Sequence, residues 1–215
     1  LDFAKTLAGE GDMDGIALPP MTLTGKAGLD GQRYTADLRL REGRGQVRVK
    51  AGLDAARMAY QALLDVKDLQ LHHFLPKDSL YGLSLTAQAE GRGTDFFSRR
   101  TRMQADVRLD GLQYGKLHLS GVGLTAHVQD GQGKVSLNSD NDLLKMEADI
   151  HALLNRRHIG MDLGVNLQSI DLYALGMMQN PFKIGMDLRI NGGTNLKDAH
   201  AAHGRINGIA LMLQD

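Results

Sequence analysis

Apolar and polar residues alternate with a period of two along almost the whole chain. Val47, Val49 and Ala51, for example, are separated by Arg48 and Lys50. Successive side chains of a β-strand point to opposite faces, so this alternation predicts a strand with one apolar face. The pattern recurs about a dozen times between Gly-containing turns, and no segment keeps a helical period over 11 residues. The sequence therefore predicts an all-β protein built from an antiparallel meander.

A few segments interrupt the alternation. Residues 71–75, 94–97 and 171–175 have a helical composition but are only about one turn long, so we expect short helical corner pieces there. Residues 117–128 are predicted to form one long strand, in which the alternation slips by one residue around Gly121. A slip of this kind indicates a β-bulge.

The composition restricts the classes of function. The 215 residues include 25 basic and 25 acidic side chains, and this balance argues against nucleic-acid binding. The chain has no Cys and no Trp, so its core is mostly aliphatic. The longest apolar run, Ile209–Leu213, is far shorter than the roughly 20 residues of a membrane-spanning helix. The chain begins with Leu1 and shows no signal-peptide pattern, so we expect a single segment, residues 1–215, of a longer protein.

No pattern of catalytic or metal-binding residues appears in the sequence. Gly-x-Ser-x-Gly and the phosphate-binding loop motif are both absent. None of the eight histidines belongs to a His-Glu-x-x-His motif or has a Cys partner. We therefore expect a protein that is not an enzyme and that needs no cofactor and no metal.

Short basic clusters occur beside two of the apolar strands. One contains Arg99, Arg100 and Arg102, and the other contains Arg156 and Arg157. We interpret both as solvated loops, with contact to lipid headgroups as the alternative.

Two parts of the chain match at a constant spacing of 101 residues. The matching positions are Val66, Leu69, Leu71, Leu85, Ala87 and Gly91 in the first part, and Leu167, Ile170, Leu172, Met186, Leu188 and Gly192 in the second. This match predicts an internal repeat over residues 66–93 and 167–194, and repeats of this kind elongate a protein by stacking similar units.

The apolar face of so many strands has almost no amphipathic helix to cover it. Three arrangements are consistent with the sequence: a two-sheet sandwich, a closed barrel, or a curled sheet left open as a trough. Flexible, aromatic-poor side chains favour the trough, because they suit disordered acyl chains. The residues predicted to line its groove are Leu83, Leu85, Met103, Val107, Met146, Ile150, Met161, Leu163, Val165, Ile184, Met186 and Leu188.

One unit of the sequence resembles the repeating pattern of TamB and AsmA-like proteins. It consists of residues 170–176, Pro181 and Phe182, an alternating strand, and Gly192 with Gly193. Residues 66–91 offer a second copy, and the general alternating texture covers nearly the whole chain.

The resemblance implies an elongated, curled amphipathic antiparallel sheet, an open "taco"-like β-groove. It also implies a place in the periplasm of a diderm bacterium, an inner-membrane anchor in the full-length protein, and a role in outer-membrane biogenesis. The implied cargo is phospholipid acyl chains or unfolded outer-membrane protein strands, and the implied partner is an outer-membrane β-barrel assembly-type protein. The alternative is a closed β-sandwich or solenoid that serves protein binding or adhesion.

Overall fold

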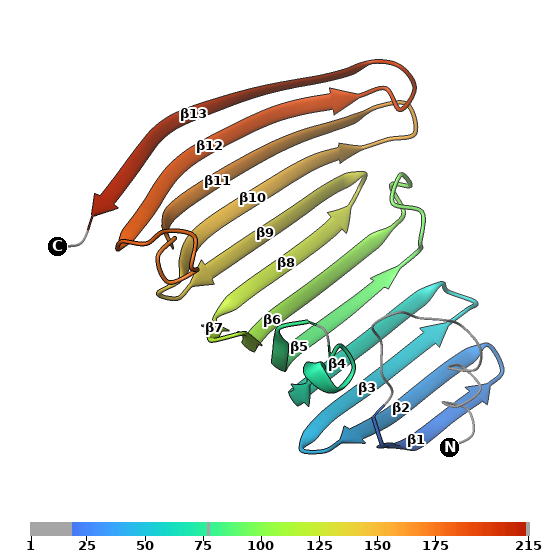
Figure 1. Cartoon of the computed structure of the whole chain (residues 1–215). Helices are drawn as coiled ribbons and strands as arrows, with labels where there is room; N and C mark the ends of the chain where they lie inside the picture. Colours follow the sequence, from blue (N-terminus) through green and yellow to red (C-terminus); the bar gives the residue numbers. More distant parts are fainter. Residues whose placement is uncertain (1–18, 77, 214–215) are drawn as a thin grey trace.

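The computed structural model describes residues 19–76 and 78–213, and in this part of the chain thirteen β-strands form a single sheet (Figure 1). The strands are β1 (Met21–Asp30), β2 (Arg33–Glu42), β3 (Gly45–Asp54), β4 (Ala59–Gln70), β5 (Leu80–Arg92), β6 (Arg102–Tyr114), β7 (Leu117–Leu119), β8 (Val122–Gln129), β9 (Gln132–Asp140), β10 (Leu144–Leu154), β11 (Ile159–Asp171), β12 (Phe182–Thr194) and β13 (His200–Leu213). The one helical element among the described residues is the 3₁₀ turn η1 (Leu71–His73) between β4 and β5.

The strands lie across the sheet in the order in which they occur in the chain. Each strand pairs antiparallel with the next, except that β6 pairs with both the short β7 and the longer β8. Tight turns set the register: Asp30 pairs with Arg33, and Gly31 between them has the positive φ of 58° that such a turn requires. Within the described chain β1 and β13 are not paired with each other, so the sheet is open and curls from one edge to the other (Figure 1). The predicted all-β curled antiparallel sheet is confirmed.

Three local predictions are wrong. Residues 94–97 form bends and turns, and residues 172–175 form turns, so only the 71–75 segment contains helix. Residues 117–128 are two strands, because Ser120 and Gly121 break the pairing with β6 between Leu119 and Val122. Gly121 has a φ of 68°, which takes the backbone out of the extended conformation at this point.

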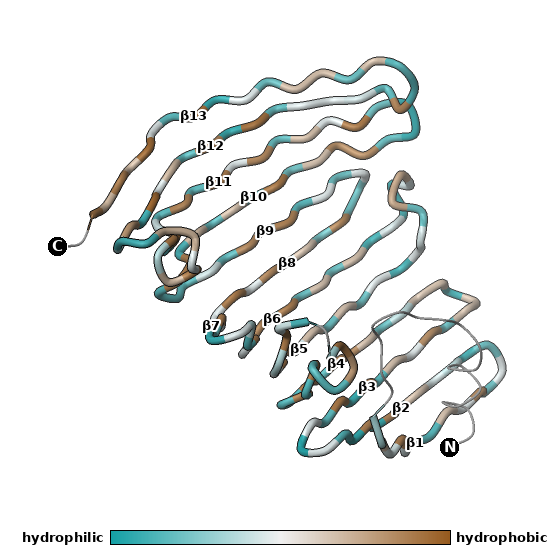
Figure 2. Tube along the Cα trace, in the orientation of Figure 1, coloured by the Kyte–Doolittle hydropathy of each residue, from teal (hydrophilic) through white to brown (hydrophobic). Residues whose placement is uncertain are grey.

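Very little of this protein is buried. Figure 2 shows hydrophobic and hydrophilic residues alternating along the strands. Among the described residues Val66 is nevertheless the one buried hydrophobic side chain, at 5% exposed. The chain exposes 14998 Å², whereas a globular protein of 23.4 kDa exposes roughly 9,700 Å². Among the described residues, a single sheet layer whose apolar face is largely uncovered contributes to this excess of exposed surface.

The hairpins β4–β5 and β11–β12 share the same pairing at the predicted spacing. Adding 101 to each residue number turns the pairs Val66–Leu85, Leu69–Leu83 and Gln70–Gly82 into Leu167–Met186, Ile170–Ile184 and Asp171–Lys183. Both hairpins also have a register shift at the same place, after Val66 and after Leu167.

Asp171 holds the corner between β11 and β12. Its Oδ1 accepts a hydrogen bond from the Ala174 N–H at 2.8 Å, and the Lys183 Nζ lies 3.4 Å from its Oδ2. The Ala174 N–H first, and Lys183 after it, lower the pKa of Asp171 below its ordinary value of 3.8. Because this pKa is lower in the folded state, the resulting stabilisation is complete above the unfolded value and is lost as the pH falls through the folded one.

We therefore expect Asp171→Asn to lower the melting temperature at pH 7, with the difference from the parent shrinking as the pH falls below about 4. Thermal unfolding followed by circular dichroism at pH 7, 5 and 3 measures this difference. Asp142→Asn, at an exposed position in the turn before β10, is the control. A difference between Asp171→Asn and the parent that stays constant with pH contradicts the role of the carboxylate.

Candidate functional site

The apolar face extends across the whole described sheet. Residues that pair in neighbouring strands lie on the same side of a sheet, so the register identifies rows that cross the strands. One such row contains Leu40, Val47, Val66, Leu85, Leu109 and Val122. The twelve residues predicted to line a groove all lie on this face. Eleven of them are partly exposed, and Met161 is 39% exposed.

A row of alanines crosses the first half of this face. Seven neighbouring strands place an alanine at the same level: Ala27, Ala36, Ala51, Ala62, Ala89, Ala105 and Ala126. Larger side chains line both sides of the row, among them Leu64 and Val107 on one side and Tyr60 and Met103 on the other. We call this row of small residues the alanine furrow. Strands about 4.8 Å apart give it a length of roughly 29 Å.

One corner of the apolar face is covered. Glu42 ends β2 on the same face as Leu40, and its side chain is only 3% exposed. Its Oε1 lies 2.5 Å from the Nδ1 of His73 in η1, so the 3₁₀ turn reaches back over the β2–β3 hairpin. No described residue hydrogen-bonds the buried Oε2 of Glu42. This contact fixes one end of the apolar face, and sequence reasoning missed it because 31 residues separate the two side chains.

The opposite face carries the polar residues. On it the Arg48 guanidinium donates to both carboxylate oxygens of Asp37, at 3.4 and 3.2 Å, and Lys50 lies 3.9 Å away. The hydrogen bond from Arg48 holds the pKa of Asp37 below its ordinary value. Other hydrogen bonds join neighbouring strands on this face, such as Asn166 to Asp187 at 2.6 Å. This face is therefore the hydrated side of the sheet.

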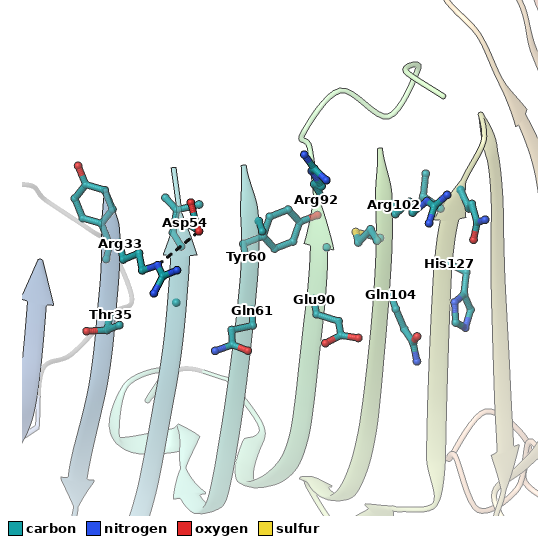
Figure 3. Close-up of a pocket in the computed structure, with 18 residues that line it drawn as sticks. Arg33, Thr35, Asp54, Tyr60, Gln61, Glu90, Arg92, Arg102, Gln104 and His127 are labelled. Carbon is teal, nitrogen blue, oxygen red and sulfur yellow. Dashed lines mark ion pairs between the residues drawn. The ribbon is translucent and has the colours of Figure 1, made fainter. Parts of the chain in front are cut away.

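A cavity of 620 Å³ lies towards one end of strands β2 to β8 (Figure 3). Gln61, Glu90, Gln104 and His127 belong to one row on four neighbouring strands, and Figure 3 shows them side by side. Tyr60 lies on the apolar side, where it extends over Gly91. A Cβ at Gly91 would be 2.6 Å from the Tyr60 hydroxyl oxygen, so the glycine makes room for the ring. The polar row presents hydrogen-bonding groups to solvent.

The described residues contain no group of three or more His, Asp or Glu side chains that could hold a metal ion. In the same part of the chain, none of the helical structure is long and apolar enough to cross a bilayer.

A scan of protein-family models, a search of curated proteins and a search of solved structures each found no match.

Proposed function

We propose that the apolar face carries the acyl chains of phospholipids. The observation that carries this proposal is the apolar surface from β1 to β13, which the described residues cover only at the η1 corner, with Val66 as the one buried hydrophobic residue of the described chain. Water contact over such a surface is unfavourable, and contiguous apolar patches of this size mark binding sites. An acyl chain that moves from water onto this face gains roughly 0.8 kcal/mol per buried CH₂.

The alanine furrow suits a linear apolar ligand. Its roughly 29 Å length is close to the ~30 Å hydrocarbon thickness of a bilayer, which two acyl chains span end to end. Beyond Ala126 the row continues with Val135, Ile150, Leu163 and Ile190, so the apolar path does not end with the alanines. A path of similar apolar sites lets a chain slide, because no single site holds it much more strongly than the next.

The resemblance to TamB and AsmA-like proteins supports a place for this activity. Under the proposal, the segment stands in the periplasm as part of a longer, inner-membrane-anchored protein. It moves lipid towards the outer membrane, where a β-barrel assembly-type protein is its partner. The alternative cargo is an unfolded outer-membrane protein strand, whose alternating apolar side chains match the same face.

A role in protein binding or adhesion is the second candidate function. The sequence-based expectation for this role is a closed sandwich or a solenoid, and both differ from the open, single-layer sheet of the described residues. The observation in its favour is the exposed edge strand β13. Among the described residues β13 pairs only with β12, so the backbone groups along its other edge can pair with a strand of another protein.

Native mass spectrometry of the purified chain, followed by organic extraction, tests the lipid proposal. We expect phospholipid to co-purify and Ala105→Phe to lower its occupancy about tenfold, because a ring in the furrow displaces about two methylenes at roughly 0.8 kcal/mol each. The open face gives the ring room, so the melting temperature should change little.

Ala201→Phe, on the polar face of β13, is the matched control and should keep the lipid. A lipid-free parent protein, or equal loss of lipid from both variants, contradicts the proposal.

A further inference from the structure

The loop between β5 and β6 is fixed across the ends of several strands. Thr101 is 2% exposed, and its hydroxyl donates to the Asp95 carbonyl at 2.6 Å. The Asp95 carboxylate accepts the Phe97 N–H at 3.1 Å and pairs with Arg156 in the β10–β11 loop. A Cβ at Gly131, in the β8–β9 turn, would lie 3.9 Å from the Arg99 Cγ. The loop therefore lies across the ends of β6, β8 and β9.

A cavity of 850 Å³ opens beside this loop, and its lining is strongly basic. Arg57, Arg92, Arg99, Arg100 and Arg102 all contribute to it. Asp95 is the one acidic residue of the lining, and its carboxylate is already paired with Arg156. Among the described residues, no carboxylate lies within 4.0 Å of the guanidinium nitrogens of Arg99, Arg100 or Arg102.

One of these arginines is held in place by the backbone. The Arg92 Nε donates to the Arg57 carbonyl at 3.1 Å, across the ends of β4 and β5. The Gly93 N–H donates to the Met58 carbonyl at 2.9 Å beside it. The cavity is thus shaped by backbone contacts before any ligand enters, and its volume is in the range of small-molecule sites, about 300–1,000 Å³.

The basic cavity adjoins the apolar face. Arg92 and Arg102 line both the basic cavity and the 620 Å³ cavity at the strand ends. The lining of the 620 Å³ cavity includes Tyr60 and Met103 of the apolar face. In the same loop Phe96 is 42% exposed and Phe97 is 37% exposed. Exposed aromatic rings beside cationic side chains are typical of surfaces that contact the boundary between lipid headgroups and acyl chains.

We propose that this cavity binds the phosphate of a phospholipid headgroup while the acyl chains of the same lipid lie on the apolar face. Arginine guanidinium groups bind phosphate oxygens through paired, charge-assisted hydrogen bonds, and several guanidiniums here have no acidic partner in the described chain. The inference rests on the proposed function and adds to it the chemistry of the headgroup.

The test compares two lipids that differ only in the phosphate. The whole soluble chain is mixed with dioleoyl phosphatidate or with dioleoylglycerol in the same detergent, and bound lipid is counted by native mass spectrometry. We expect the parent to bind phosphatidate at least about tenfold more tightly than dioleoylglycerol, and Arg99→Gln with Arg100→Gln to abolish most of this preference. Binding of dioleoylglycerol should be unchanged in the variant, because the apolar face is intact.

Arg39→Gln with Arg41→Gln is the matched control, since it removes the same charge from the polar face of β2. It should keep the preference, and both double variants should show the melting temperature of the parent.

If the parent binds the two lipids equally, or if the control loses the preference to the same extent, the headgroup site is overturned and the proposed function stands. If the parent binds neither lipid, the proposed function falls as well. Displacement of phosphatidate by an equimolar amount of inorganic phosphate would show a free-anion site and overturn the assignment to a lipid headgroup.

Discussion

Met161→Asp is expected to reduce bound acyl chains roughly a hundredfold or more while the sheet remains folded. Met161 lies on the apolar face of β11 between Ala152 and Gly192 and is 39% exposed, so a carboxylate there stays hydrated in the free protein. An acyl chain passing over it must cover a charge, and burial of an unpaired charge costs several kcal/mol. Lipid occupancy by native mass spectrometry and the melting temperature by circular dichroism measure the two effects.

Gln46→Asp adds the same charge to the polar face, beside Arg41 and Lys67, and provides the control. It should keep both the lipid and the fold. If Met161→Asp retains its lipid, acyl chains do not lie over β11. If Met161→Asp unfolds the protein instead, Met161 is buried in a closed core, and this result would contradict the open apolar face.

Val66→Asp should have the opposite result, with loss of the fold as the primary effect. Val66 is 5% exposed, between Val47 and Leu85 on the apolar face. A charge at this position has no partner and no water, so we expect the free energy of unfolding to fall by about 4 kcal/mol. Urea denaturation measures this loss through the midpoint of the transition.

Val128→Asp makes the same exchange at a partly exposed position of the same face. It should be much less destabilising, because its carboxylate reaches water. If the two variants are equally destabilised, Val128 is as inaccessible to water as Val66. This outcome would contradict an apolar face that is open to solvent.

The alternation of side chains was sufficient to predict the fold class. A period of two holds for β3 as for β11, and the short turn after Asp30 fixes how β1 meets β2. Openness could not be predicted in the same way, because a sandwich, a barrel and a trough all need one apolar face. The slip of the alternation at Gly121 predicts a bulge, whereas the strand breaks there, because sequence alone does not show whether the backbone keeps its pairing partner.

The alanine furrow and the basic cavity depend on contacts between strands. Each alanine, such as Ala62 or Ala105, is visible in the alternation of its own strand. Their alignment appears only once the register of every hairpin is known. The cluster around Arg99 was also visible, but the pairing of Asp95 with Arg156 joins residues 61 positions apart. No local pattern in the sequence indicates that contact.

The order of strands in this meander has a consequence for how the protein is made. Apart from β6, which also pairs with β8 beyond the short β7, every described strand pairs only with strands next to it in the chain, so the stability of the sheet is close to a sum over neighbouring pairs. Folding can then begin at any hairpin and spread one strand at a time, without waiting for a distant segment to return. A chain that emerges N-terminus first can add each new strand to a finished edge. During synthesis, the last strand to have formed then provides the hydrogen-bonding edge for the next one.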